Sequence, residues 1–239
     1  TPYHFNFHVD DVGHSFICGP TGSGKTTVQL FLSAMMGQFG ITQVFFDYGR
    51  GSEVYVWSER GKFFALKVGE PTGMNPFQME PTQQNINFVT DLFIRLVTGR
   101  GREITQRQQS ELESAVQNVF TLPKKQRRAS SLIEYMNRAD PDGLAKKLAR
   151  WVGDGQMAWL FDNEEDTIDF SRRVTGFNIK EFIDNDEVRT VTMMYLFHRM
   201  TEIDDGRRLR VDIGEFWKAL DDDYFSQWVK AFLNTKRKD

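Results

Sequence analysis

Gly19-Pro20-Thr21-Gly22-Ser23-Gly24-Lys25-Thr26 is the stretch of sequence that decides the fold of this chain. It fits the pattern G-x-x-x-x-G-K-[ST], in which consecutive backbone N–H groups curl around a phosphate at the start of a helix. Glycine at 22 and 24 allows a close approach that a side chain would block. We expect Lys25 to reach the β- and γ-phosphates of a nucleoside triphosphate and the Thr26 hydroxyl to bind Mg²⁺, with Thr27 completing the nucleotide-binding segment.

The elements around this loop predict an α/β fold. The apolar run His14–Cys18 predicts a short buried strand, in which the lone cysteine is buried. Residues Thr26–Gln38 predict a helix that is apolar almost all round and therefore covered on most sides. Gln43–Asp47 predicts a second strand, and Leu209–Ile213 a last one. A strand, a loop, a helix and a strand in succession favour a mainly parallel sheet.

Between residues 85 and 152 the pattern of apolar residues becomes that of amphipathic helices, which are predicted over Asn87–Val97 and Gln106–Phe120. We interpret this segment as a helical lobe inserted into the P-loop core. The expected organisation is therefore a first part of the core over 1–84, the lobe over 85–152 and a second part of the core over 153–239. Further helices are predicted over Asp184–Met200 and Phe216–Asn234.

A hydrolysing P-loop enzyme needs a carboxylate that holds Mg²⁺ and a second one that polarises water. The chain reads Leu209-Arg210-Val211-Asp212-Ile213-Gly214-Glu215 near its end. Glu215 follows the strand directly and is the candidate general base. Glycine precedes it, so two alternatives stay open. Either the strand ends at Val211 and Asp212 holds Mg²⁺, or the site lacks that acid.

Charge and composition narrow the possible partners. The net charge is −3, so no global basic field favours nucleic acid, and such binding would have to be local. Lys124–Arg128 is a local basic run that is more typical of a solvated loop. One cysteine excludes an internal disulfide framework. No apolar run approaches the roughly 20 residues of a membrane-spanning helix.

Several longer strings are more specific than the phosphate-binding loop. They are Phe46-Asp47-Tyr48-Gly49-Arg50-Gly51, Gly69-Glu70-Pro71-Thr72-Gly73-Met74-Asn75-Pro76-Phe77-Gln78, Glu187-Val188-Arg189-Thr190, Tyr195-Leu196-Phe197-His198-Arg199 and Glu215-Phe216-Trp217-Lys218-Ala219-Leu220. With these strings, in this order over nearly its whole length, the chain resembles the VirB/TrbE/CagE-type ATPases of type IV secretion and conjugal DNA transfer systems.

The resemblance implies a RecA-like ATPase domain with a helical insert, from the C-terminal half of a larger protein. It implies ATP and Mg²⁺ as cofactors, and a homo-oligomer, a hexamer, that acts with other type IV secretion subunits. Such a protein would be cytoplasmic and peripheral at the bacterial inner membrane, where it powers pilus biogenesis and substrate transfer. Arg50 and Arg189 would contact a γ-phosphate or a neighbouring subunit, although surface ion pairs are an equal alternative. The family has Asp where this chain has Gly214.

Two other functions remain open at the level of sequence. The departure at Gly214 favours a structural subunit that binds nucleotide with little turnover. A DNA-translocating ATPase of the coupling-protein or FtsK/HerA group would have the same fold, and the acidic net charge argues mildly against it.

Overall fold

A computed structural model describes residues 13–99, 103–203, 207–220, 226–227 and 229–230, apart from the side chains of 216 and 219. The chain divides into two compact units. The first unit contains the described parts of Thr1–Phe64, Arg172–Lys180 and Asp204–Asp239. The second contains those of Ala65–Ser171 and Glu181–Ile203.

The described strands form a four-stranded sheet in the order β2-β3-β1-β4. Their bounds are Thr42–Asp47 for β1, Lys62–Ala65 for β2, Val174–Asn178 for β3 and Leu209–Ile213 for β4. The central strand β1 is parallel to both β3 and β4, which confirms the predicted parallel sheet. Residues Thr42–Phe46 of β1 are buried, as the apolar run predicts for a central strand.

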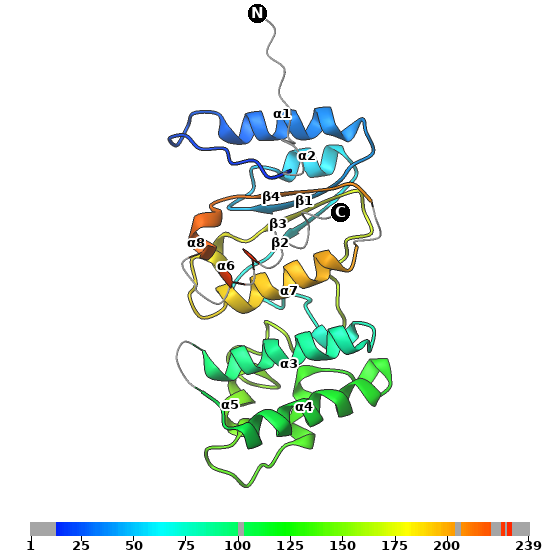
Figure 1. The fold of residues 1–239 in the computed structure, drawn as a ribbon, viewed down its shortest axis with the longest axis vertical. Coiled ribbons are helices and arrows are strands. Elements are labelled where there is room, and N and C mark those ends of the chain that lie inside the picture. Colours follow the sequence, from blue (N-terminus) through cyan, green and yellow to red (C-terminus); the bar gives the residue numbers. More distant parts are fainter. Residues whose placement is uncertain (1–12, 100–102, 204–206, 221–225, 228, 231–239) are drawn as a thin grey trace, which may run out of the picture. The chain divides into compact units, whose positions relative to one another are not determined.

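Helices α1 (Lys25–Gly37) and α2 (Glu53–Ser58) lie on the same face of this sheet (Figure 1). Leu30 of α1 and Tyr55 of α2 pack against a buried cluster of Phe45, Val56 and Val174. The predicted helix from Phe216 begins as α8 (Phe216–Leu220), and most of its predicted length lies outside the described residues. The first unit thus places the helix that follows the phosphate-binding loop over the sheet.

Two predictions about the start of this unit are wrong. Residues His14–Cys18 are extended without strand pairing, and Cys18 is exposed rather than buried. Phe16 is 89% exposed. An apolar run becomes a strand only where a sheet edge pairs with its backbone, and among the described strands β4 pairs with β1 alone. Helix α1 is not covered on most sides either, because its residues Val28, Phe31 and Met35 are exposed.

The second unit is mainly helical. Its principal helices are α3 (Gln83–Thr98), α4 (Gln106–Thr121), α5 (Leu144–Leu148) and α7 (Arg189–Thr201). A short helix, α6 (Lys180–Ile183), begins at the last residue of the first unit's segment Arg172–Lys180 and precedes α7. Short 3-10 helices lie at Pro76–Gln78, Lys124–Gln126, Ala129–Tyr135 and Ala149–Trp151. The expected lobe of residues 85–152 lies within this unit, which extends beyond the lobe on both sides. Among the described residues, no helix combines the length and apolar character that crossing a membrane requires.

Helix α7 begins five residues later than the sequence predicts. Asn185 accepts a hydrogen bond from Glu187 N–H through its side chain, over 3.0 Å, which forms a turn instead of the first helical turn. The helix then runs from Arg189, and most of its side chains are buried.

Candidate nucleotide-binding site

The phosphate-binding loop ends where α1 begins, as its pattern predicts. Gly22 and Gly24 have φ angles of 80° and 85°, left-handed conformations that glycine adopts without strain. Lys25 is the first residue of α1, and Val28 N–H donates to Gly24 O over 3.0 Å. The unpaired N–H groups of the first turn therefore adjoin the loop, which is the arrangement that binds phosphate at a helix N-terminus.

The ammonium group of Lys25 lies within the curl of this loop. Its Nζ donates to Gly19 O over 2.7 Å and to Pro20 O over 3.0 Å. Ser23 N–H also donates to Pro20 O, over 3.2 Å, which closes the loop on itself. The loop therefore brings a compact positive charge to the N-terminus of α1, where both favour a polyphosphate.

Asp47 is a carboxylate of this site that the sequence motifs do not single out. It ends β1, and Ser52 donates to its Oδ2 through N–H over 2.6 Å and through Oγ over 2.9 Å. A Cβ on Gly51 would lie 3.1 Å from Thr26 Cγ2 and 3.6 Å from Asp47 Oδ2. The Thr26 methyl group of α1 and the Asp47 carboxylate of β1 thus both lie next to Gly51. The available sequence signal is an acid at a strand end that is followed by glycines.

Asp212 lies within β4 and is held in a network of its own. Its Oδ1 accepts from Gln29 Nε2 over 3.0 Å, and both oxygens accept from Arg210, each over 2.8 Å. The side chains of Arg210 and Asp212 are each 10% exposed. Sequence reasoning missed Gln29, which links this ion pair to α1. The strand does not end at Val211, because β4 runs to Ile213.

Glu215 follows β4 in an uncommon backbone conformation. Its φ is 50°, a left-handed value that costs energy in a residue with a side chain. Trp217 Nε1 donates to its Oε2 over 2.7 Å. Gly214 N–H donates to Phe46 O over 2.8 Å, so the loop after β4 stays attached to β1. Glu215 is therefore exposed at the end of the sheet where Asp47 also lies.

The two arginines of the resemblance have different surroundings. Arg50 forms an ion pair with Glu53, and its side chain is 58% exposed. The hydrogen bond and charge of Glu53 raise the pKa of Arg50. Arg189 belongs to the second unit, is buried, and pairs with Asp186 over 2.5 Å while its Nε donates to Ile183 O. Only Arg50 of the two is accessible at the surface of its unit.

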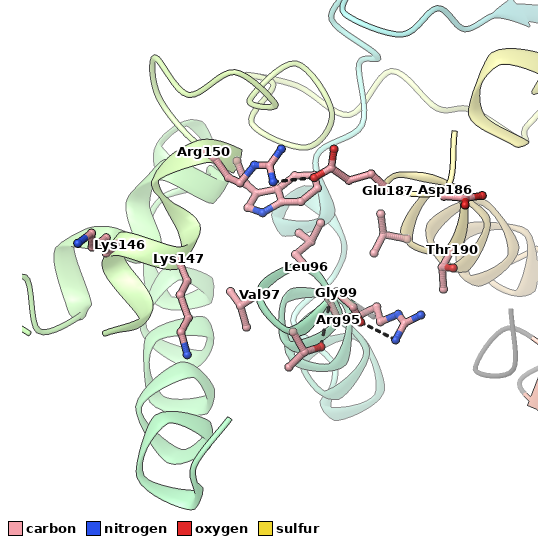
Figure 2. Close-up of a pocket in the computed structure, with 13 residues that line it drawn as sticks. Arg95, Leu96, Val97, Gly99, Lys146, Lys147, Arg150, Asp186, Glu187 and Thr190 are labelled. Carbon is pink, nitrogen blue, oxygen red and sulfur yellow. Dashed lines mark hydrogen bonds and ion pairs between the residues drawn. The ribbon is translucent and has the colours of Figure 1, made fainter. Parts of the chain in front are cut away.

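A separate cavity of about 720 Å³ lies in the second unit (Figure 2). Arg95, Lys146, Lys147 and Arg150 line it, together with acidic residues before α7. Arg150 pairs with Glu187 over 2.6 Å. Its walls carry both signs of charge, so they favour no single class of ligand.

A glycine-rich loop that opens a helix beside a parallel sheet defines a domain of α/β class with a P-loop. The structure of VirB4 of Thermoanaerobacter pseudethanolicus matches 91% of this chain and 64% of that chain, with a TM-score of 0.69 and 16% identity. This match shows a shared, RecA-like fold. No protein-family model matches the chain.

The sequence comparisons identify the relatives. The chain is 39% identical over 239 residues to the type IV secretion system protein virB4 of Bartonella quintana. It is 36% identical over 262 aligned residues to the type IV secretion system protein PtlC of Bordetella pertussis. These alignments cover 100% and 99% of this chain, but only 30% and 32% of the relatives. The chain is thus homologous to a segment of the VirB4/PtlC type IV secretion proteins and spans about a third of their length.

Proposed function

We propose that this chain binds ATP with Mg²⁺ and hydrolyses it as the motor part of a type IV secretion subunit. The observation that carries the proposal is the complete phosphate-binding loop at the N-terminus of α1, with Lys25 inside it. Whole-chain homology to VirB4 and PtlC supports the secretion role. We place the subunit at the cytoplasmic face of the inner membrane, with other secretion subunits as its partners.

The residues of the first unit have distinct roles in this proposal. The N–H groups of Gly22 to Thr27 and the Lys25 ammonium hold the β- and γ-phosphates, and the Thr26 hydroxyl is the ligand of Mg²⁺ from α1. Bound Mg²⁺ neutralises charge that develops on the phosphate oxygens. Glu215 accepts a proton from the water that attacks the γ-phosphorus, while the bond from that phosphorus to the bridging oxygen of ADP breaks.

Arg50 and Arg189 have unequal support as phosphate contacts. In a ring of subunits, an arginine from one protomer stabilises the transition state of its neighbour. Arg50 is accessible for this role, although it would have to release Glu53. Arg189 would have to leave a buried site. We therefore favour Arg50 as the contact between protomers of a hexamer.

Two substitutions in the full-length protein test the proposed function. Lys25→Ala should abolish ATP binding, because it removes the cation of the loop. Glu215→Gln should preserve binding and slow phosphate release by about 100-fold, the lower range for loss of a general base. Lys146→Ala, an exposed lysine of the second unit, is the matched control and should change neither quantity. Normal ATP binding by Lys25→Ala would refute the proposal.

A structural subunit with little turnover is the second candidate. Gly214 stands where the family has an acid, and Asp212 is already engaged by Arg210 and Gln29. Under this alternative, wild-type phosphate release is slow and Glu215→Gln barely changes it, while ATP still binds. The same assay therefore separates the two functions.

A further inference from the structure

Asp47 and Asp212 are the two candidate carboxylates for the magnesium site of the first unit. They differ in the hydrogen bonds that their oxygens accept. Both oxygens of Asp212 accept hydrogen bonds from Arg210, and Oδ1 accepts another from Gln29. Binding a cation through Asp212 would therefore break this ion pair, in which both side chains are only 10% exposed. Breaking a buried ion pair is costly, so Asp212 is poorly suited to bind metal.

Asp47 has the opposite arrangement. Ser52 donates two hydrogen bonds to its Oδ2, from N–H and from Oγ, which fix the plane of the carboxylate. Within the described part of the chain, no hydrogen bond is donated to its Oδ1. A carboxylate that is oriented through one oxygen and open at the other is suited to bind Mg²⁺, since metal-binding carboxylates are themselves held by hydrogen bonds.

The position of Asp47 relative to α1 also suits this role. The missing side chain of Gly51 leaves room between Thr26, whose methyl carbon Cγ2 would lie 3.1 Å from a Cβ placed there, and the Asp47 carboxylate. Asp47 Oδ2 and Oδ1 lie 3.6 and 3.8 Å from that position. Hydroxyl and carboxylate oxygens are hard ligands of the kind that Mg²⁺ prefers. Thr26 and Asp47, which both lie next to Gly51, are therefore residues of the kind that hold this cation.

Asp47 also lies beside the position that lacks its usual acid. In the register of the sheet Phe46 is opposite Ile213, so Asp47 and Gly214 come next on the two strands. A Cβ on Gly214 would lie 3.1 Å from Tyr48 N and 3.6 Å from Tyr48 Cβ, directly against the residue after Asp47. Asp47 and Gly214 are thus neighbours at the same end of the two strands.

We infer that Asp47, and not Asp212, supplies the carboxylate of the magnesium site, beside the Thr26 hydroxyl. This inference rests on the proposed function, because the cation arrives with the nucleotide. Arg210, Asp212 and Gln29 then have a different role, which is to hold α1 against β4.

Magnesium-dependent nucleotide binding tests this inference without reference to turnover. The dissociation constant of a non-hydrolysable ATP analogue is measured by calorimetry on the full-length protein, once with Mg²⁺ and once with EDTA. Asp47→Asn should reduce the gain in affinity from Mg²⁺ by about tenfold or more, as loss of a metal-site carboxylate does elsewhere. Its affinity in EDTA should be no weaker than that of the wild type. The asparagine keeps an oxygen that accepts from Ser52 N–H, so α2 should still form.

Two further variants make the result specific. Gly51→Ala should also reduce the gain from Mg²⁺, because its methyl group enters the space between Thr26 and Asp47. Asp212→Asn should leave that gain unchanged. Loss of the gain in Asp212→Asn with retention in Asp47→Asn would overturn the inference and leave the proposed function intact. A wild-type protein that binds no nucleotide under either condition would overturn both.

Discussion

At the residue scale, the first unit shows how two aspartates on neighbouring strands take different roles. Phe45 of β1 is opposite Asp212 of β4, and Asp47 lies two residues further along β1. The difference lies in their neighbours, because Arg210 is two residues before Asp212 and takes both of its oxygens. An arginine in β4 whose side chain is only 10% exposed is paired there because an unpaired buried charge is costly. Both oxygens of its partner, Asp212, are therefore used in this ion pair and do not serve to bind a metal ion.

The Arg210–Asp212 ion pair gives a first prediction. Asp212→Asn should lower the free energy of unfolding by about 3 kcal/mol, because removing one charged partner of a buried ion pair is strongly destabilising. Urea denaturation followed by circular dichroism measures this loss. Glu70→Gln, which removes the exposed pair of Glu70 with Lys67, is the control and should cost less than about 0.5 kcal/mol. Equal losses in the two variants would contradict the role given to Arg210.

His198 gives a prediction about pH. Burial lowers its pKa from 6.5 to about 4. Its ring is stacked on Phe88 and its Nε2 lies 2.8 Å from Asn85 Oδ1, so the neutral ring fills this site. The unfolded chain binds the proton more readily than the folded chain between pH 6.5 and 4. Stability from this group is therefore complete above pH 6.5 and is lost as the pH falls toward 4.

The size of the His198 effect follows from the same shift. The pKa difference corresponds to a decrease of up to about 3 kcal/mol in the free energy of unfolding on acidification. Partial solvent access makes the actual decrease smaller. Urea denaturation at a series of pH values measures it. His198→Gln should flatten the profile between pH 6.5 and 4 relative to the wild type. An unchanged slope in this variant would show that other groups cause the acid sensitivity.

At the scale of elements, the sequence predicted those that depend on local signals. Helix α4 begins at Gln106 as expected, because Thr105 and Gln108 form a reciprocal capping box there. Strand β4 has the bounds that the apolar run predicts. The strand expected over His14–Cys18 failed because pairing is a non-local property that an apolar run does not determine. Among the described residues, the lack of a hydrogen bond to Asp47 Oδ1 likewise depends on several separate elements, which local sequence does not reveal.

The capping box of α4 gives a prediction at this scale. Thr105 Oγ1 accepts from Gln108 N–H, and Gln108 Oε1 accepts from Thr105 N–H, each over 3.2 Å. Thr105→Ala should lower the stability of the second unit by about 1 kcal/mol, the usual cost of a lost N-cap. Chemical denaturation measures the loss. Ser110→Ala, at an exposed position inside the same helix, should be neutral or stabilising, since alanine favours helices.

At the scale of the whole molecule, the two compact units separate the residues of the proposed nucleotide chemistry from the helical part. The phosphate-binding loop, Asp47, Asp212 and Glu215 all belong to the first unit. The sequence predicted an interrupted core, because the helical texture begins near residue 85. The structure instead groups residues from Ala65 onward, and the helix α7, with the helical part. Helix α7 carries long apolar side chains that suit either unit, so its sequence alone did not assign it.

This division predicts where nucleotide changes backbone protection. A ligand that binds only the folded first unit stabilises it by about 2.7 kcal/mol at a concentration 100 times its dissociation constant. Hydrogen exchange with mass spectrometry should therefore show slower exchange in α1, β1 and β4 when the non-hydrolysable ATP analogue and Mg²⁺ are added. Peptides from α3 and α4 should change little, because no residue of the phosphate-binding loop lies in their unit. Lys25→Ala should remove the protection everywhere, whereas Asp47→Asn should reduce it in proportion to the lost magnesium-dependent affinity. Protection confined to α3 and α4 would instead place the nucleotide in the second unit and contradict the site described for the first.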